Sequence, residues 1–275
     1  MNPSSAADSA IKVVAVGDIA YTVGGAQEAT ASLTQALDPS LLLLIGDLAY
    51  NKGSKSEFTK KFIPSWGPVV KAQQTIAVPG NHEYKTSNAN GYRSFIKTYK
   101  LPKTGNDLWS VKKVGGYTII GLDSEGLGKG ANLNAKGKRE KKFLTKALAQ
   151  NNGRPTIVMW HRPRFSSGEH GDQKDVGVTT LWNIVSADTD VKLVLWGHDH
   201  NFETGQPTAT TGRQVPTMVI GTGGAEQRDC TGTTCIANVF GVASLTLKPQ
   251  SIDWEFRTTQ ESGTGKLRDS GTISW

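Results

Sequence analysis

Five short polar motifs, each placed directly after a short apolar run, constrain this sequence more than any other feature. The apolar runs read as buried strands at 13–16, 41–45, 75–78, 156–160 and 191–196. The motifs that follow them are Gly17-Asp18, Gly46-Asp47-Leu48-Ala49-Tyr50, Gly80-Asn81-His82-Glu83, His161 and Gly197-His198-Asp199-His200. In an open α/β sheet, sites form in the crevice beyond the carboxyl ends of the strands. The sequence therefore predicts that these polar side chains gather along one edge of a sheet.

The chemistry of these side chains predicts a metal site with too many ligands for one metal ion. Carboxylate and phenol oxygens are hard ligands and imidazole is intermediate, a mixture that suits iron, manganese or zinc and does not suit calcium. A carboxylate can bridge two metals, and paired metals clamp the attacking and leaving oxygens of an in-line displacement at phosphorus. In His198-Asp199-His200 an extended backbone would place both imidazoles on one side.

The order of the predicted elements favours an α/β fold. We expect strands near 12–17, 41–45, 74–78, 108–113, 116–122, 155–160 and 191–196, with helices near 25–37, 54–72 (with a break at Pro64), 138–149 and 175–187. Later strands are expected near 215–221, 238–247, 250–258 and 267–274. Such βα units followed by a run of strands suit two packed mixed β-sheets flanked by helices. We expect residues 11–275 to form a single domain that is β-rich from about 203, after a disordered stub at 1–10.

The composition narrows the class of partner. Hydrophobic residues make up 37% of the chain and charged residues 20%, which is typical of a globular protein. No apolar run approaches the roughly 20 residues of a membrane-spanning helix. The net charge of +7 favours anionic substrates. No arginine-rich or aromatic-basic motif indicates nucleic acid as anything more than a substrate, and nothing indicates an oligomeric state.

The two cysteines carry the expectation about the cellular compartment. Cys230 and Cys235 are separated by small residues that allow a tight loop, and we expect a disulfide between them; two free thiols are the alternative. Disulfides persist in oxidising compartments. The first ten residues have neither the basic nor the apolar segment of a signal peptide and resemble the start of a mature chain. We therefore expect a secreted or periplasmic protein whose signal peptide has been removed.

As a series, the motifs resemble those of the calcineurin-like metallophosphoesterases, over roughly residues 12–202. Two details resemble the purple acid phosphatase branch of that superfamily. Ala20 stands where most of the superfamily has histidine, and Tyr50 stands three residues after Asp47, where the branch has an iron-binding tyrosinate. The resemblance implies a four-layer αββα sandwich with a binuclear metal centre.

Carried over residue by residue, the resemblance also implies ligand sets and catalytic groups. Ferric iron would be held by Asp18, Asp47, Tyr50 and His200. Ferrous iron, zinc or manganese would be held by Asp47, Asn81, His161 and His198, with Asp47 as the bridge. His82 matches a phosphate-contacting and proton-donating histidine, and His170 fits a substrate-facing histidine by its spacing.

The activity implied is hydrolysis of phosphate monoesters by attack of metal-bound hydroxide on a small phosphate ester. A phosphodiesterase acting on nucleotide or lipid diesters at the same site is one alternative, and a non-catalytic phosphate-binding module is another. Asp199 departs from the usual apolar residue, and it either orients a ligand imidazole or faces solvent. Other residues have both a site and a surface or structural interpretation: Tyr21, Glu83, Asp123, Arg162 and Arg164.

Overall fold

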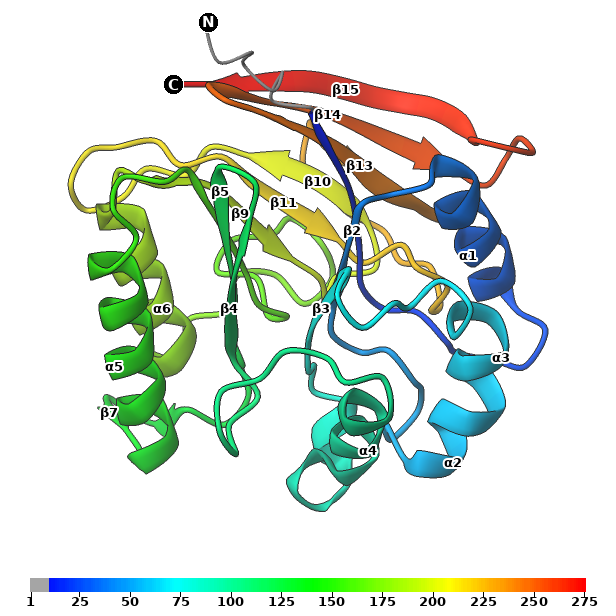
Figure 1. Cartoon of the computed structure of the whole chain (residues 1–275), viewed down its shortest axis with the longest axis horizontal. Coiled ribbons are helices and arrows are strands. Elements are labelled where there is room, and N and C mark those ends of the chain that lie inside the picture. The colour runs from blue at the N-terminus through cyan, green and yellow to red at the C-terminus, as the bar shows by residue number, and fades with distance from the viewer. Residues whose placement is uncertain (1–9) are drawn as a thin grey trace, which may run out of the picture.

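The computed structural model describes residues 10–275 and contains two large β-sheets flanked by helices (Figure 1). The first sheet has the strand order β15-β14-β13-β1-β2-β3, and the second has the order β12-β10-β11-β9-β8-β5-β4. The predicted stub lies outside the described residues except for Ala10, which has no regular structure. Within the described part of the chain, no helix is both long and apolar enough to cross a bilayer.

The strands of the first sheet are β1 (Ile11–Val16), β2 (Leu41–Ile45), β3 (Thr75–Val78), β13 (Gly241–Lys248), β14 (Ser251–Thr258) and β15 (Lys266–Ser274). Those of the second are β4 (Ser110–Val114), β5 (Tyr117–Gly121), β8 (Thr156–Met159), β9 (Val191–Trp196), β10 (Phe202–Gly205), β11 (Thr217–Ile220) and β12 (Cys235–Ile236). A small separate hairpin consists of β6 (Gly128–Lys129) and β7 (Asn132–Leu133).

The alternation of side chains along β2 explains why the run 41–45 is apolar throughout. Leu41, Leu43 and Ile45 belong to the core between the two sheets. Leu42 and Leu44 belong to a second core beneath helices on the outer face. A third core lies between the second sheet and its own helices. Strands covered on both faces read as continuous apolar runs, so the predicted architecture of two mixed sheets with helices outside is confirmed.

The helices lie on the two outer faces, with α1 to α4 on one side and α5 and α6 on the other (Figure 1). They are α1 (Ala26–Leu37), α2 (Lys55–Glu57), η1 (Phe58–Phe62), α3 (Ile63–Trp66), α4 (Asn90–Thr98), α5 (Ala135–Ala149) and α6 (Val176–Ala187). Two single-turn segments, η2 (Glu83–Lys85) and η3 (Ser87–Ala89), precede α4.

The second predicted helix differs in two ways from the helix observed. It ends at Trp66 instead of 72, and it continues through Pro64 without a break. Pro64 lies at the start of α3, directly after a π-helical segment. Because the π-helical segment already interrupts the regular α-helical hydrogen bonds at this point, the missing N–H of proline does not end the helix. Helix α5 begins three residues earlier than predicted, where the Asn134 side chain accepts a hydrogen bond from Gly137 N–H.

Helix α4 and strands β10 and β12 are not among the predicted elements. The stretch Asn88-Ala89-Asn90-Gly91 reads as a turn, and both Asn88 and Ala89 do adopt left-handed backbone angles just before α4 begins. The buried face of α4 then carries Tyr92, Phe95 and Ile96.

The C-terminal strands complete the sheet in which the first motif is built. β13 pairs antiparallel with β1, so that Ile11 lies opposite Leu247, and β1 therefore lies between β2 and β13. Phe202 of β10 stacks on Phe256 of β14 with ring centroids 4.0 Å apart, which joins the two sheets. The regular elements described after residue 201 are the strands β10 to β15.

The expected disulfide between Cys230 and Cys235 is present. It closes a loop that contacts the segment before His170, since Cys230 forms a β-bridge with Gly168 and Thr231 N–H donates to Ser167 O at 3.1 Å. The disulfide therefore supports one of the loops that carry candidate site residues.

We expect replacement of both Cys230 and Cys235 by serine to lower the free energy of unfolding by about 2 kcal/mol, because the short loop is no longer closed in the unfolded chain. Urea unfolding of the variant and of the wild-type protein measures the difference. Thiol titration of the denatured, unreduced wild type should find no free thiol. Two free thiols, or equal stability of the two proteins, would contradict the assignment.

Candidate metal centre

The five motifs follow β1, β2, β3, β8 and β9, so that both sheets contribute to one site. The loops after β1 and β2 run side by side, because Asp18 N–H donates to Gly46 O at 3.0 Å and Ile19 N–H donates to Asp47 O at 2.9 Å. Between the sheets, the imidazole of His161 lies 2.9 Å from Ile45 O. The site thus lies where strand ends of two packed sheets meet, and not along one edge of a single sheet.

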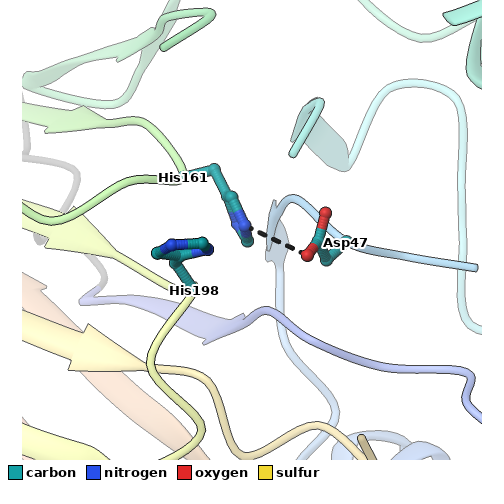
Figure 2. Close-up of side chains that lie close together, drawn as sticks. All are labelled: Asp47, His161 and His198. Carbon is teal, nitrogen blue, oxygen red and sulfur yellow. Dashed lines mark ion pairs between the residues drawn. The ribbon is translucent and has the colours of Figure 1, made fainter. Parts of the chain in front are cut away.

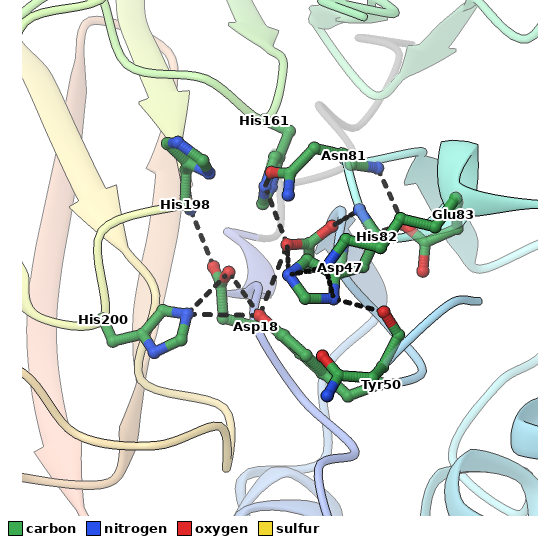
Figure 3. Close-up of polar contacts among 12 residues, drawn as sticks. Asp18, Asp47, Tyr50, Asn81, His82, Glu83, His161, His198 and His200 are labelled. Atoms are coloured by element: carbon green, nitrogen blue, oxygen red, sulfur yellow. Dashed lines mark hydrogen bonds and ion pairs between the residues drawn. The ribbon is translucent and has the colours of Figure 1, made fainter. Parts of the chain in front are cut away.

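One group of side chains consists of Asp18, Tyr50 and His200 (Figure 3). Tyr50 Oη donates to Asp18 Oδ1 at 2.9 Å, and it lies 3.2 Å from His200 Nε2. His200 Nε2 lies 3.5 Å from the same carboxylate oxygen. A carboxylate, a phenol and an imidazole therefore present one ligand atom each to a common point.

A second group consists of Asp47, His161 and His198, each of which offers a ligand atom within 4.8 Å of the others (Figure 2). Asn81 Oδ1 lies 3.1 Å from His161 Nε2 and so joins this group. Asp47 Oδ2 lies 3.2 Å from His161 Nε2 and 3.4 Å from Tyr50 Oη. This oxygen therefore borders both groups.

Backbone hydrogen bonds fix how each carboxylate presents its oxygens. His198 N–H donates to Asp18 Oδ2 at 2.8 Å, and His82 N–H donates to Asp47 Oδ1 at 2.7 Å. In each aspartate one oxygen is thereby held by the backbone, and the other faces the neighbouring site residues.

Backbone carbonyls fix the imidazoles in the same way. The Nδ1 atoms of His161 and His200 contact the carbonyls of Ile45 and Glu226. Because a carbonyl only accepts hydrogen bonds, each Nδ1 carries the hydrogen, and each Nε2 is left to face the site.

Three of these residues adopt left-handed backbone angles, which residues other than glycine rarely take. The φ angles are 58° at Asp18, 49° at Asp47 and 73° at His198. Such strain clusters at functional sites, where the surroundings hold it in place. The bend at His198 also overturns the expectation of an extended His-x-His. It sends His198 toward Asp47 and His200 toward Asp18.

The glycines in the motifs are required by close approach. A Cβ atom on Gly80 would lie 2.3 Å from Asp47 Oδ1, and one on Gly197 would lie 2.7 Å from Asp18 Oδ2. Both contacts are shorter than any side chain tolerates. Each of the pairs Gly80-Asn81 and Gly197-His198 therefore combines a candidate ligand with a glycine. The missing side chain of the glycine leaves room for the neighbouring aspartate carboxylate.

The charges of the site are balanced for a bound cation. Burial alone would raise the pKa of Asp47, but His161 and His82 hold it well below its usual range. Burial disfavours protonated His161, yet the charges of Asp47 and Asp18 raise its pKa to about 10. The carboxylates therefore hold a proton on an imidazole that would have to be neutral to bind metal. A metal cation fits this donor set because it would replace that proton.

Tyr50 is a phenol at ordinary pH in these surroundings. Burial first, and then the negative charges of Asp18 and Asp47, raise its pKa far above the usual value. It would bind a metal as tyrosinate only if a strongly charged cation offset both carboxylates.

His82 stands beside these groups, and its side chain reaches the cavity. Its ring lies 4.3 Å from the ring of Tyr50, centroid to centroid, and Nε2 lies 3.9 Å from Asp47 Oδ2. Nδ1 donates to Asn51 O at 2.7 Å. Burial, opposed by Asp47 and aided by nearby Lys85, lowers the pKa of His82.

His170 also lines the cavity, and Asp199 holds it there. Asp199 is fully buried, and its Oδ1 accepts hydrogen bonds from His170 N–H at 2.8 Å and from Nδ1 at 2.9 Å. The alternative in which Asp199 faces solvent is therefore wrong, and the imidazole that it orients is not one of the predicted metal ligands. The imidazole that it orients is that of His170, whose ring lies 4.3 Å from the His198 ring.

Glu83 stabilises the site by accepting hydrogen bonds from backbone N–H groups. Its buried carboxylate accepts hydrogen bonds from the N–H groups of Asp47 and Leu48, both at 2.9 Å, and of Gly80 at 2.7 Å. Burial and the charge of Asp47 raise its pKa to about 8. Glu83 thus ties the loop after β2 to the loop after β3.

Of the remaining candidates, Arg162 contacts a candidate ligand, whereas Asp123 and Arg164 contact other parts of the protein. Arg162 Nη1 lies 3.2 Å from His198 Nε2, while its Nε donates to Glu125 at 2.8 Å. Asp123 pairs with Lys136 at 2.8 Å, away from both groups of ligand atoms. The guanidinium of Arg164 lies over the ring of Phe165.

Most of the site residues line one cavity, together with residues that the motifs did not indicate; those from the predicted set are Asp47, Tyr50, Asn81, His82, His170, His198 and His200. These additional lining residues are Tyr21, Asn51, Glu226 and Arg228. Tyr21 follows Asp18 by three residues, as Tyr50 follows Asp47, and Asn51 directly follows Tyr50. The sequence carries no signal for Glu226 and Arg228, because they reach the cavity only through the approach of a separate loop.

The fold and the site together define a metallophosphoesterase. The calcineurin-like phosphoesterase family matches residues 11–202, and the chain belongs to that family. This family of hydrolases depends on two metal ions, and the resemblance seen in the motifs is thereby confirmed at the family level.

Solved structures show the same fold at low sequence identity. The anchor protein GAP50 of the Plasmodium inner membrane complex is 14% identical with a TM-score of 0.70, covering 97% of this chain and 89% of its own. PhoD is 11% identical with a TM-score of 0.70, covering 97% and 70%. A dimetal phosphatase from Danio rerio is 11% identical with a TM-score of 0.63, covering 96% and 98%.

Among curated proteins, the uncharacterized proteins MT2654 and Rv2577 of Mycobacterium tuberculosis are each 24% identical over 144 residues. The match covers 46% of this chain and 27% of the length of those proteins.

We expect Asp199→Ala to lower kcat about 10-fold or more, toward the roughly 10²-fold lower end for a proton-transferring group, because the His170 imidazole loses its only side-chain hydrogen bond among the described residues. Asp199→Asn keeps an accepting oxygen and should retain most of the activity. Asp199→Ala combined with His170→Ala should be no slower than His170→Ala alone. Steady-state kinetics measure this cycle, with Asp253→Ala on β14 as control. Additive losses, or loss of metal from Asp199→Ala, would refute the positioning role.

Proposed function

We propose that the protein is a binuclear metal-dependent phosphatase of the purple acid phosphatase type, which hydrolyses phosphate monoesters. The observation that carries the proposal is the position of Asp47 Oδ2 between two groups of ligand atoms, 3.2 Å from His161 and 3.4 Å from Tyr50. A carboxylate shared in this way is suited to bridge two metal ions.

In this proposal the ligand sets are those expected from the motifs. Asp18, Asp47, Tyr50 and His200 hold ferric iron, whose charge offsets the cost of ionising Tyr50. Asp47, Asn81, His161 and His198 hold the second ion, which is ferrous iron, zinc or manganese. Bound together, such ions supply a water of low pKa and a positive clamp for phosphate oxygens.

The chain's own groups handle the substrate and the leaving group. His82 and His170 both line the cavity, one held by Asn51 O and the other by Asp199. His82 donates the proton that the leaving alkoxide needs, and His170 contacts the ester. Arg162 and Glu83 act indirectly, through His198 and the backbone at Asp47.

Two other functions are alternatives to the proposed one. A phosphodiesterase could use the same ligand set, and the choice depends on the cavity walls. A non-catalytic phosphate-binding module needs no complete donor set, and the presence of ligand atoms from all seven expected ligand positions in the two groups favours an enzyme. Activity of the metal-loaded protein on a monoester and a diester panel separates the three.

We also propose that the protein is secreted or periplasmic. The support is the disulfide between Cys230 and Cys235, since such bonds persist outside reducing compartments. Thiol titration of the protein taken directly from its producing cells tests this, because free thiols there would remove the support.

Metal analysis of variants tests the bridge. We expect Asp47→Ala to lose both metal ions, because both depend on that carboxylate, whereas Asn81→Ala should mainly lose the second. Tyr50→Phe should keep metal but lose the pink or purple colour that a ferric tyrosinate confers. Element analysis and visible absorption spectra measure these outcomes. Wild-type metal content in Asp47→Ala, or an active and colourless iron-containing wild type, would refute the assignment.

Replacement of His82 separates catalysis from metal binding. His82→Ala should keep both metals and turn over roughly 10²–10⁴ times more slowly, the usual contribution of a general acid. The loss should be greatest for esters of poorly acidic alcohols and least for an activated aryl ester, whose leaving group needs no proton. Equal slowing of both ester types, or loss of a metal, would show that His82 is not the proton donor.

A further inference from the structure

Arg228 lines the same cavity as His82, His170 and His200, although none of the sequence motifs contains it. It lies after β11, in the segment that also supplies the Glu226 carbonyl to His200. A second, open pocket beside the first is lined by Glu169, Asp229 and Asn238 as well as by Arg228 and Glu226. Arg228 therefore stands at the boundary between the candidate metal cavity and the space beside it.

The guanidinium of Arg228 uses few of its donors. Nη1 donates to the carboxylate of Glu169. Nε is buried and has no hydrogen-bond partner among residues 10–275. A guanidinium has five N–H donors, and a buried donor without a partner is costly. Nη2 makes no hydrogen bond within residues 10–275 and is not buried, so it is the donor that a further acceptor entering the cavity can reach.

The bond to Glu169 does not commit Arg228 to a structural role. The Glu169 side chain is 59% exposed and that of Arg228 is 32% exposed. Ion pairs open to solvent contribute little to stability. An anion inside the cavity can therefore take over donors of Arg228 at little cost to the fold. Phosphate is well suited to do so, because its oxygens match the forked donors of arginine.

We propose that Arg228 binds the phosphate group of the substrate and makes the site select dianionic monoesters over monoanionic diesters. The inference rests on the proposed phosphatase function. Above its second pKa of about 6, a phosphate monoester carries two charges, and a diester carries one. A monoester also has three unesterified oxygens and a diester two. A monoester with two of its oxygens held by the metal ions would keep the third for Arg228.

Glu169 makes this proposal distinguishable from a purely structural role. If the pair only fastens two loops together, removal of either partner has the same effect. If Arg228 binds phosphate, Glu169 competes with the substrate for the guanidinium. Removing the arginine then weakens substrate binding, and removing the carboxylate strengthens it. The two substitutions have effects of opposite sign.

The experiment compares Arg228→Ala, Arg228→Lys and Glu169→Gln in the metal-loaded protein on one monoester and one diester with the same aryl leaving group. Arg228→Ala should raise KM for the monoester about 10-fold or more, as loss of a charge-assisted hydrogen bond does. For the diester, KM should change less than about 3-fold, because a diester carries a single negative charge and interacts less strongly with the guanidinium. Arg228→Lys should be intermediate, because it keeps the charge and loses the fork.

Glu169→Gln should lower KM for the monoester. Arg139→Ala is the matched control, because Arg139 forms an exposed ion pair with Asp107 away from the cavity, and its KM values should equal those of the wild type. Equal increases in KM for both esters, or the same effect from Arg228→Ala and Glu169→Gln, would overturn the inference.

Calorimetric titration of inorganic phosphate into the metal-loaded proteins provides a readout that needs no turnover. Arg228→Ala should bind phosphate about 10-fold more weakly than the wild type. Equal affinities overturn the role of Arg228 even if both proteins are active phosphatases. A wild type that binds phosphate through Arg228 but hydrolyses neither ester retains this contact and instead refutes the proposed function.

Discussion

The arrangement of the site depends on one buried carboxylate, that of Asp47. Its Oδ1 is held by His82 N–H, and its Oδ2 lies between His161 and Tyr50. Its own N–H is held by Glu83, which also binds the backbone of the loop after β3. Because two loops and both groups of ligand atoms meet at this residue, a shift of Asp47 would disturb both groups. Burial makes such a charge costly unless it is fully paired.

The surrounding backbone keeps the carboxylates in place at an energetic cost. Asp18, Asp47 and His198 all have left-handed φ angles, and each such residue costs of order 1–3 kcal/mol. The three packed cores on either side of the two sheets supply the burial that offsets this cost. In this fold the strained loops therefore depend on the apolar strands. The rigid strand ends hold the loop residues at backbone angles that they would not adopt on their own.

The sequence was sufficient to predict the parts of this protein that depend on local pattern. Apolar runs predicted the strands that carry the motifs, and residues directly after strand ends meet wherever those strands lie in packed sheets. Helix α4 was not predicted because it begins directly after two left-handed residues, Asn88 and Ala89, within a turn-like sequence.

Partners brought together by distant loops could not be predicted in the same way. Asp199 was recognised as unusual, but its choice of His170 depends on how the loop after β8 folds back. The pairing of Arg228 with Glu169 has no pattern in the sequence at all. Such pairs arise from the approach of two irregular segments, and no period or spacing records that approach.

The pairing of β1 with β13 has a consequence for the order in which the site can form during synthesis. The first motif is anchored late in the chain, since Gly17 N–H donates to Ile220 O and Ala225 N–H donates to Asp18 O. A nascent chain that has emerged only as far as Asp47 holds both key aspartates yet lacks the strands that fix Asp18. Pairings of such long sequence separation form slowly. The loop that carries Asp18 can therefore take its final position only after the chain past Ala225 has been made.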